Sequence, residues 1–407
     1  MPLPQQLHLM PGARRDGIFA MWYGKGPGVD RCGDVFRHAN HAGTSRHGGV
    51  LVVAGDDHAA RSSAVAHQSE HVFSACAIPV LAPASVQDIL DFGLHGWAMS
   101  RYCGCWVALK LSADVVESAA TVEIDAARVA VRTPDFALPA DGLHIRWPDP
   151  QLAQEQRMQA YKIYAAVAYA RANGLDRLVW DSPGARLGLV ACGKAWLDLR
   201  EALHALGIDA AAAARLGLRV YKVGMPWPLE AAGARRFADG LEEVLVVEEK
   251  RQIIEYQLKE MLYDWPDARR PRVLGKFDET GEWPAPPHQW LLPPTGEMTP
   301  AVVARAVAAR LARIDPGGAW PQRAQAVAGP APEPEAPAPA ARPVPPPAPK
   351  PAPPVTTPPP TVATPVTPAP PKPAAEPIKP AVAPARPAAE TIKPANFLVS
   401  SAITVSL

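Results

Sequence analysis

Residues 49–57 read Gly49-Val-Leu-Val-Val-Ala-Gly-Asp-Asp57, an apolar run that ends in two acidic residues. Such an unbroken apolar run is typical of a parallel strand that is buried on both faces. A helix is expected to begin after Ser85, because serine is a good N-cap and Asp88 follows three residues later. A second apolar strand is expected at residues 106–111. Strand, helix and strand in this order predict a parallel sheet with a right-handed crossover.

The helix that follows Ser85 is expected to pack through one face. Its apolar positions recur every three or four residues, the spacing at which side chains share one side of a helix. These positions are Val86, Ile89, Leu90, Leu94 and Trp97.

A second α/β pattern follows an irregular, proline-bearing stretch at residues 121–150. A long helix is expected from residue 151 to about residue 173, with Gly174 as its C-terminal cap. Thr299-Pro300 forms a good N-cap and N1 pair for a last helix. Between these points the pattern predicts strands at 187–191, 218–223 and 244–247, and helices at 195–206 and 252–263. We therefore predict two α/β units joined by a helical connector.

The bulk composition limits the classes of function. With 407 residues the chain has room for two α/β domains and an extra segment. A net charge of +1 argues against binding to nucleic acid or to an anionic membrane as the main task. The five cysteines include no Cys-x-x-Cys pair, and the sequence shows neither an export signal nor an apolar run of membrane-spanning length. We expect a cytoplasmic protein with reduced thiols.

The composition changes sharply after Asp315. Residues 316–394 contain 28 of the 49 prolines, interleaved with alanine, valine, threonine and lysine. Proline removes backbone donors and alanine buries little surface, so a segment of this composition cannot offset the entropy that it loses on ordering. We predict that residues 316–407 form a disordered, semi-extended tail.

Polar residues follow the buried strand directly, at the place where ligands bind in open α/β sheets. Arg61 is suited to hold a substrate carboxylate through paired hydrogen bonds, and His58 to assist proton transfer near neutral pH. Asp57, Ser62 and Ser63 lie in the same stretch. The alternative is that the two aspartates at the end of the strand cap the next helix and that the rest is a solvated loop.

Two patterns upstream of this strand give weaker signals. Gly24-Lys-Gly-Pro-Gly28 can bring backbone N–H groups close to an anion, but it lacks the Walker and dinucleotide spacings and is more often an ordinary turn. His38-x-x-His41, with Cys32 and His47, suggests zinc. No close second pair supplies a fourth ligand, so we predict no metal site on this chain.

Other residues are interpreted as structural. Cys103 and Cys105 precede a buried strand and are expected to pack in the core. Glu248 and Glu249 follow the strand at 244–247 and are expected to cap a helix. Neither a cluster-binding run of cysteines nor a Gly-x-Ser-x-Gly elbow occurs in the sequence.

The chain also carries several longer motifs between about residue 11 and residue 313. They are Trp22-Tyr-Gly-Lys-Gly-Pro-Gly-Val-Asp-Arg31, Phe36-Arg-His-Ala-Asn40, Gly43-Thr-Ser-Arg-His-Gly-Gly49, Gly55-Asp-Asp-His58, Asp91-Phe-Gly-Leu-His-Gly-Trp97, Ile145-Arg-Trp-Pro-Asp-Pro150 and the segments at 222–229 and 248–258. Together these motifs resemble the bacterial indolepyruvate ferredoxin oxidoreductase family.

The resemblance implies an α/β protein with a partial thiamine-diphosphate-binding fold, the side that embraces the aminopyrimidine ring, at residues 1–120. Residues 121–175 would be a crossover and helical connector, and residues 176–315 a transketolase C-terminal-like domain. In the wider family the Gly-Pro-Gly turn and the loop after the next strand line the cofactor and substrate cleft. Carried over, the cofactor-binding residues are Gly26, Pro27, Gly28, Asp30 and Asp57, the catalytic residue is His58, and the substrate-binding residues are Arg61, Ser62 and Ser63.

The implied reaction is oxidative decarboxylation of an aryl or related 2-oxoacid, with thiamine diphosphate as coenzyme, ferredoxin as electron acceptor and coenzyme A as acyl acceptor. Family members carry an upstream acidic residue that drives aminopyrimidine tautomerisation, and a downstream diphosphate-binding domain with a Gly-Asp-Gly magnesium motif and cluster cysteines. This sequence contains no Gly-Asp-Gly triplet. Magnesium and the iron–sulfur cluster are therefore expected on missing segments or a partner chain, and one sheet edge is expected to be unpaired or covered by another chain.

Three functions remain open at this point. We favour part of a 2-oxoacid:ferredoxin oxidoreductase that is inactive without the missing parts in trans. The second is a non-catalytic remnant or scaffold that uses its folded domains and proline-rich tail for assembly. The third is a complete enzyme of another class that uses the histidine-rich rim with a metal.

Overall fold

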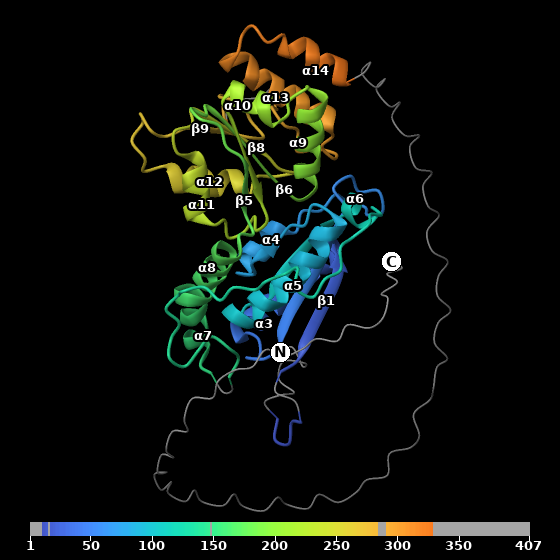
Figure 1. Ribbon diagram of the computed structural model, residues 1–407. Helices are drawn as coiled ribbons and strands as arrows, with labels where there is room; N and C mark the ends of the chain where they lie inside the picture. Colours follow the sequence, from blue (N-terminus) through green and yellow to red (C-terminus); the bar gives the residue numbers. More distant parts are fainter. Residues whose placement is uncertain (1–9, 15–16, 147–148, 284–289, 329–407) are drawn as a thin grey trace, which may run out of the picture. The chain divides into compact units, whose positions relative to one another are not determined.

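The computed structural model describes residues 10–14, 17–146, 149–283 and 290–328, and its framework is a pair of β-sheets (Figure 1). The first sheet has the strand order β1-β2-β4-β3, and all its pairings are parallel. The strands predicted at 49–54 and 106–111 are confirmed as β2 (Gly49–Asp56) and β4 (Val107–Ser112). The sequence prediction lacks the strands that flank them, β1 (Phe19–Lys25) and the two-residue β3 (Val80–Leu81).

β2 is buried on both of its faces, as its apolar run predicts. Val50 and Val52 pack in one core cluster with Phe36, whereas Leu51 packs in another with Phe92. This alternation follows from the two-residue period of a strand. The helices of this half are α2 (Gly26–Arg31), α3 (Gly33–Ala42), α4 (Glu70–Ala75), α5 (Val86–Cys103) and α6 (Ala113–Val116).

α5 begins as predicted but buries a different face. The backbone N–H of Asp88 donates to Ser85 Oγ at 3.1 Å, which confirms the N-cap. The predicted apolar face is wrong for Leu90 and Leu94, which are 42% and 53% exposed. A Cβ at Gly96 would lie 2.5 Å from a methyl carbon of a β2 leucine, so the helix approaches the sheet through its smallest residue. The buried residues around this contact are Phe92, Met99, Ser100 and Cys103.

The connector helix is confirmed with one irregularity. It consists of α7 (Gln151–Arg157), the π-helical turn η2 (Met158–Lys162) and α8 (Ile163–Asn173). Gly174 closes it in the left-handed conformation, with φ at 59°. The residues between α6 and α7 form no described helix or strand, as expected for the irregular stretch at 121–150.

Lys162 ties the connector to the first half of the chain. Its side chain is 1% exposed, and its Nζ donates to the carbonyl oxygens of Asn40 and His41 at 3.3 and 3.2 Å. These carbonyls belong to the last turn of α3, where a helix lacks internal donors. A cation is favourable at that end of a helix because the backbone dipoles point their negative ends there.

The second sheet has the strand order β5-β7-β6-β8-β9. The three predicted strands are confirmed as β6 (Leu187–Cys192), β7 (Leu218–Val223) and β8 (Glu243–Val247), which run parallel to one another. The prediction lacks both edge strands, β5 (Arg177–Trp180), which pairs antiparallel with β7, and the three-residue β9 (Arg272–Leu274). β5 is largely exposed and β9 is short, so neither produces a long apolar run.

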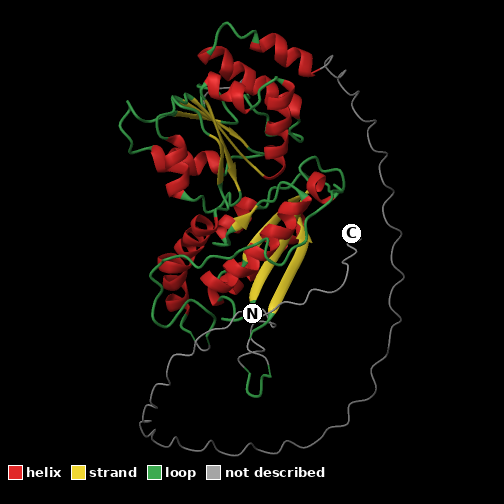
Figure 2. Cartoon of the chain, viewed as in Figure 1, coloured by secondary structure: helices red, strands yellow, loops and turns green. Residues whose placement is uncertain are grey.

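Helices lie on both sides of the second sheet (Figure 2). The predicted cap of the last long helix is confirmed, because Thr299 Oγ1 accepts the backbone N–H of Val302 at 3.4 Å. Among the described residues, none of the helices combines the length and the apolar run that crossing a bilayer requires. The helices of this half are α9 (Gly193–Ala205), α10 (Ala210–Leu216), α11 (Ala231–Ala238), α12 (Ile254–Leu262) and α13 (Pro300–Ile314).

The predicted disordered tail begins too early in the sequence. Residues 320–328 form a further helix, α14 (Trp320–Ala328), instead of part of that tail. Trp320 is 4% exposed, and its indole Nε1 donates to Asp315 Oδ2 at 3.0 Å. Pro321 stands in the first turn, where a helix needs no backbone donor. The rest of the predicted tail lies outside the described residues, and the domain boundaries at residues 120 and 175 stay predictions.

We expect the buried Lys162 cation to make stability depend on alkaline pH. Burial lowers the pKa of Lys162 to about 8, whereas an unfolded lysine titrates at about 10.4. Between these values the unfolded chain binds more protons, so the free energy of unfolding should rise with pH, by about 3 kcal/mol in full. Urea unfolding of the wild type and of Lys162→Met from pH 7 to 10.5 measures this. The difference between the two proteins should change with pH only above about 8, and a constant difference would contradict the buried cation.

Candidate functional site

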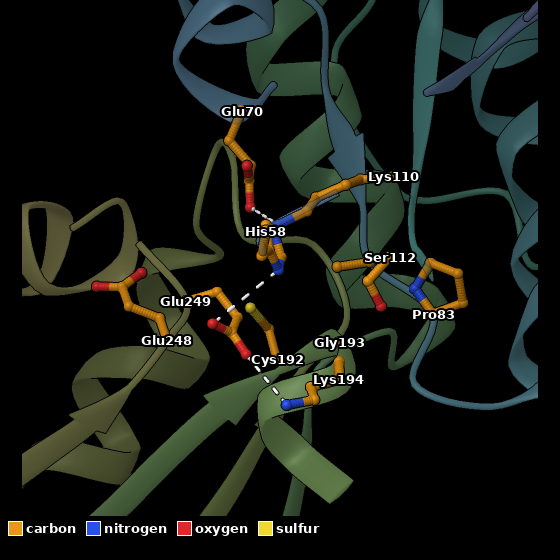
Figure 3. Close-up of a pocket in the computed structure, with 11 residues that line it drawn as sticks. His58, Glu70, Pro83, Lys110, Ser112, Cys192, Gly193, Lys194, Glu248 and Glu249 are labelled. Carbon is orange, nitrogen blue, oxygen red and sulfur yellow. Dashed lines mark hydrogen bonds and ion pairs between the residues drawn. The ribbon is translucent and has the colours of Figure 1, made fainter. Parts of the chain in front are cut away.

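The carboxyl ends of parallel strands from both sheets meet around one small cavity, which we name the junction cavity (Figure 3). Its volume of about 20 Å³ gives room for about one water molecule. The first sheet contributes residues after β2 and on β4, and the second contributes residues after β6 and β8. The acidic and basic side chains that line it are His58, Glu70, Lys110, Lys194, Glu248 and Glu249.

Lys110 forms the central ion pair on the side of the first sheet. Its Nζ lies 2.5 Å from Glu70 Oε1 and 3.8 Å from Asp56 Oδ2, and the exposed fractions of these side chains are 9% or less. Burial opposes the lysine charge, but Glu70 and Asp56 together raise the pKa of Lys110 above its usual range. Burial also raises the pKa of Asp56, against the attraction of Lys110. We expect Lys110 to stay charged, since two carboxyl groups share it.

His58 is held as a neutral ring. It is 2% exposed, its Nδ1 lies 4.0 Å from Glu249 Oε2, and its Nε2 lies 4.0 Å from Asp56 Oδ2. Nε2 has no hydrogen-bond partner among the described residues. Burial, followed by the charges of nearby lysines such as Lys110, lowers the pKa of His58 to about 2. Proton transfer by His58 near neutral pH therefore stays a prediction, and this arrangement does not favour it.

Lys194 and Glu249 form the matching pair on the side of the second sheet. Lys194 lies in the first turn of α9, just after Gly193, whose φ of +53° turns the chain from β6 into the helix. Lys194 Nζ lies 3.4 Å from Glu249 Oε1 and 2.9 Å from Asp198 Oδ2. Glu249 also accepts the backbone N–H of Met298 at 3.2 Å. Figure 3 shows Glu249 between His58 and Lys194, so one carboxylate joins the two halves of the chain.

Glu248 is a helix cap, as the sequence predicts for this strand exit. Its Oε2 accepts the backbone N–H groups of Ile253 and Ile254 at 3.0 and 2.9 Å, and its Oε1 that of Glu255 at 3.1 Å. Burial nevertheless raises the pKa of Glu248 to about 7. Its carboxyl group is thus occupied by the start of α12.

Asp57 organises the loop that holds the predicted substrate residues. Its Oδ1 accepts the backbone N–H of Arg61 at 2.9 Å, and its Oδ2 accepts the N–H and hydroxyl of Ser62 at 2.7 and 3.1 Å. The backbone hydrogen bond from Ser62 is the main reason that the pKa of Asp57 is lowered. Asp56 likewise holds Ser69, the residue before α4. Both aspartates therefore have local structural contacts, as the alternative interpretation expects.

Arg61 lies at the rim and already has acidic partners. Its side chain is 56% exposed, its Nη1 lies 3.3 Å from Asp114 Oδ1, and its Nη2 pairs with Glu297. Asp114 Oδ2 is also 3.7 Å from Lys194 Nζ, so Arg61 connects through one carboxylate to the junction cavity. Ser63 follows in the same loop and is half-buried. A carboxylate ligand at Arg61 has to displace one of these partners.

The predicted cofactor-binding residues Gly26, Pro27, Gly28 and Asp30 all lie in α2, directly after β1. The interpretation of this segment as an ordinary turn is wrong, because Pro27 stands in the first turn of a short helix. A Cβ at Gly26 would lie 2.1 Å from the ring of His67, so only glycine fits beneath that ring.

Two contacts bring α2 and the loop after β2 together. His67 Nε2 lies 3.1 Å from Asp30 Oδ2. Lys25, the residue before α2, donates from Nζ to Ser62 Oγ at 2.6 Å. The predicted cofactor and substrate residues therefore occupy one edge of the first sheet.

Comparison with known proteins identifies the second half of the chain. Residues 176–326 match the indolepyruvate ferredoxin oxidoreductase middle domain. This part of the chain is therefore similar to the middle domain of the indolepyruvate ferredoxin oxidoreductase family. The chain is 27% identical over 281 residues to the indolepyruvate oxidoreductase subunit IorA of Methanothermobacter thermautotrophicus, an alignment that covers 67% of this chain and 42% of that subunit. The IorA of Pyrococcus abyssi is 27% identical over 256 residues, which cover 61% of this chain and 37% of that subunit.

The chain thus spans about two fifths of the length of the curated relatives that it matches. A solved 2-oxoglutarate:ferredoxin oxidoreductase from Magnetococcus marinus is similar with a TM-score of 0.47 and 14% identity. That similarity covers 75% of this chain and 55% of the solved chain.

The sequence prediction of the site missed the ion pairs that surround His58. They are Lys110 with Glu70 and Lys194 with Glu249. One local signal was present, since Lys110 interrupts the otherwise apolar strand at 106–111. The other three residues follow no short-range pattern, because each pair joins segments that are at least 40 residues apart in the chain.

The histidines and cysteines outside this cavity have other surroundings. His38 and His41 lie on α3. Within the described residues, histidine, cysteine and acidic side chains form no group of three or more that is placed to hold a metal ion. Cys103 and Cys105 are fully buried in the core, which confirms their predicted packing role.

The residues at the junction cavity do not fit the coenzyme that the family implies. A cavity with room for about one water molecule is too small for thiamine diphosphate. The described residues also offer no acidic group of metal ligands for a magnesium diphosphate. We therefore assign no step of a thiamine-dependent reaction to these residues alone.

We expect the buried pair of Lys110 and Glu70 to be strongly coupled. Lys110→Met leaves two carboxyl groups without their shared cation, and Glu70→Gln removes a partner of the lysine. Each change should lower the free energy of unfolding by about 3–5 kcal/mol, and the double variant should lose clearly less than the sum. Urea unfolding at pH 7 measures the three values. Arg186→Met, which breaks an exposed pair with Glu242, is the control and should cost about 1 kcal/mol or less. Strictly additive losses would contradict the coupling.

Proposed function

We propose that this chain is part of a thiamine-diphosphate-dependent 2-oxoacid:ferredoxin oxidoreductase of the indolepyruvate type. The observation that carries this proposal is the match of residues 176–326 to the family's middle domain. The alignment with IorA subunits is longer than this domain, so it includes residues of the first half of the chain. Because the chain spans about two fifths of those subunits, the proposal concerns one portion of an enzyme.

The proposed reaction is the oxidative decarboxylation of an aryl or related 2-oxoacid. The substrate loses its carboxylate as CO₂, coenzyme A takes the acyl group, and ferredoxin accepts the two electrons. Thiamine diphosphate supplies the carbanion chemistry when it is bound, and the protein supplies binding and orientation. In this proposal the diphosphate, magnesium and iron–sulfur sites lie on polypeptide other than the described residues.

Arg61 is the proposed recognition group for the 2-oxoacid carboxylate. Its guanidinium is accessible, and Asp114 and Glu297 orient it at the rim of the strand ends. A guanidinium binds a carboxylate through two parallel hydrogen bonds, which fixes the orientation of the ligand. Ser62 and Ser63 lie beside it on the loop that Asp57 caps. His58 then acts as a neutral hydrogen-bonding group behind this rim.

An exposed apolar surface on the first half of the chain supports the proposal of a partner. We name it the β1–α5 face; it consists of Phe19, Met21 and Tyr23 on β1, which are 45%, 54% and 76% exposed, with Leu90 and Leu94 on α5. The two elements are adjacent, because the rings of Phe19 and Trp97 lie 5.7 Å apart. A continuous apolar surface on a folded protein marks a contact site. We propose that the portion of the oxidoreductase not spanned by this chain covers this face.

Reconstitution tests the proposed function. The chain should not reduce ferredoxin with indolepyruvate and coenzyme A by itself, but should do so when combined with a partner that carries the magnesium motif and cluster cysteines. Calorimetric titration should likewise detect thiamine diphosphate and Mg²⁺ binding only in the combined sample. Assembly without any turnover would favour a scaffold instead. Full turnover by the isolated chain would contradict the need for a partner.

In the reconstituted enzyme we expect Arg61→Ala to weaken 2-oxoacid binding. Loss of a charge-assisted pair should raise KM by about tenfold or more, with a smaller change in kcat. Steady-state kinetics over a range of indolepyruvate concentrations measures both constants. The control is Arg128→Ala, which removes an arginine that pairs with Asp91 and Glu123. Equal KM values for the two variants would exclude Arg61 from carboxylate recognition.

We expect Met21→Asp to block association with the partner and to leave the isolated chain folded. A charge on the β1–α5 face has to be desolvated when a partner covers it, whereas in the free chain it stays in water. Analytical ultracentrifugation of the mixture measures association, and the melting temperature of the isolated variant measures folding. Val35→Asp alters an exposed apolar residue of α3 outside this face and should not change association. Normal assembly of the Met21 variant would show that the partner binds elsewhere.

A further inference from the structure

A second cavity is lined by the connector helix and by the half of the chain that matches the family's middle domain, and it shares no lining residue with the junction cavity. We name it the α8–α11 cavity, after the two helices that line it together with β5 and β7. Its volume of about 400 Å³ lies in the range of small-molecule sites. It is large enough for a ligand, whereas the junction cavity has room only for water.

One end of this cavity carries an unsatisfied acidic group. Asp176 Oδ1 accepts the backbone N–H groups of Gly224 and Met225 at 2.8 and 3.1 Å. Asp176 Oδ2 is buried and has no hydrogen-bond partner among the described residues. Burial raises the pKa of Asp176 to about 7, so its charge is only weakly favoured without a ligand. A buried carboxylate oxygen in this state gains most from a ligand that donates a hydrogen bond or brings a positive charge.

The neighbouring carboxylate is already used by the protein. Glu230 Oε1 accepts from Arg171 Nε at 2.7 Å. Its oxygens also accept the backbone N–H groups of Ala232 and Gly233 at 2.9 and 2.6 Å, which caps α11. Among the acidic groups that line the cavity, Asp176 is therefore the one with a buried oxygen that lacks a hydrogen-bond partner in the described part of the chain.

The cavity also contains an arginine that no carboxylate neutralises. Arg219 pairs with Asp181 at 2.7 Å, whereas Arg236 on α11 has no recorded ion-pair or hydrogen-bond partner within the described ranges. Burial raises the pKa of Tyr221, the acidic groups raise it further, and Arg236 lowers it. The hydroxyl of Tyr221 therefore lies in the field of both the acidic end and Arg236. The cavity is bipolar.

Apolar side chains also line this cavity. Phe237 is stacked on Tyr221 with ring centroids 5.1 Å apart, and Leu178 adds an aliphatic surface that is 48% exposed. A simple anion would meet the carboxyl group of Asp176, and a simple amine would leave Arg236 without a counter-ion. A ligand with an ammonium group, a carboxylate and an apolar body satisfies every one of these features.

We propose that the α8–α11 cavity binds an α-amino acid with an apolar side chain. The ammonium group donates to Asp176 Oδ2, the carboxylate pairs with Arg236, and the side chain packs on Leu178 and Phe237. This site is independent of the proposed oxidoreductase function, because none of its residues lines the junction cavity. In this proposal the chain has a ligand-binding site that is separate from the junction cavity.

Calorimetric titration of the full chain tests this proposal. The ligands are L-phenylalanine, L-leucine and L-tryptophan, with phenethylamine and 3-phenylpropanoate as probes that each lack one charge. At least one amino acid should bind, phenethylamine should bind about tenfold more weakly, and 3-phenylpropanoate should not bind measurably. Binding of the amino acid should tighten from pH 6 to 8, because Asp176 loses its proton over this range while the ammonium group keeps its own.

Three variants locate the site. Asp176→Asn keeps the acceptor for Gly224 and Met225 but loses the negative charge, and it should weaken amino-acid binding at least about tenfold and remove its pH dependence. Arg236→Gln should weaken binding of the amino acid but not of phenethylamine. Glu242→Gln is the control, since it changes an exposed carboxylate that pairs with Arg186 outside the cavity, and it should leave affinity unchanged.

The outcomes separate cleanly. Absence of binding by all three amino acids up to about 10 mM would overturn the proposal, because such an affinity is below any specific site of this size. Unchanged affinity in Asp176→Asn, with a melting temperature equal to that of the wild type, would also overturn it. If Asp176→Asn melts early, the Arg236→Gln comparison between amino acid and amine decides instead. Equal binding of 3-phenylpropanoate would show that the site is a plain anion site.

Discussion

The arrangement of this chain depends on the compensation of charges that are removed from water between its two sheets. Lys110 on β4 and Lys194 at the start of α9 each need a carboxylate within ion-pair distance, and Glu70 and Glu249 supply them. A buried charge without its partner costs several kcal/mol, so each half can place its lysine at the shared cavity because a carboxylate of the same half neutralises it. His58 lies between the pairs and is neutral for the same reason. The small volume of the junction cavity is thus a consequence of charge pairing as much as of apolar packing.

Much of the fold was predictable because it is encoded locally. Apolar runs in the sequence predicted β2, β4, β6, β7 and β8, and capping residues predicted where α5 and α13 begin. β1 was not predictable, because its glycine and lysine end resembles a turn and its alternate residues are exposed. The buried face of α5 was mispredicted. The close approach of Gly96 to the sheet decides which side of the helix is buried, and the spacing of apolar residues along the helix does not show this. Trp320 likewise anchors α14 within a proline-rich composition.

The sequence predicted where part of the candidate site lies, but it did not predict which side chains contact one another there. The carboxyl end of β2 follows from the strand pattern, and the predicted residues from Asp57 to Ser63 follow that strand. The predicted residues from Gly26 to Asp30 follow β1, a strand that the pattern did not predict. The contacts of these residues were not predictable. The carboxylate of Asp57 accepts backbone N–H groups of its own loop, and the carboxylate of Asp30 pairs with His67. Lys194 and Glu249 come from the second sheet, more than 130 residues later in the chain. Such proximity is a property of the packed tertiary structure and leaves no short-range signal.

The first sheet has two unlike edges. At β3 the backbone is covered, because Val80 N–H donates to the carbonyl oxygen of Trp227 at 2.7 Å and Ala82 N–H to that of Gly224 at 2.9 Å. At β1 no strand neighbour exists within the described ranges, and its seven residues contain no proline. Open backbone of this kind is a template for pairing. A fibre needs two open edges on every molecule, but this sheet has one. Two copies that paired through their β1 strands would therefore leave no open edge on this sheet and would stop at a closed dimer.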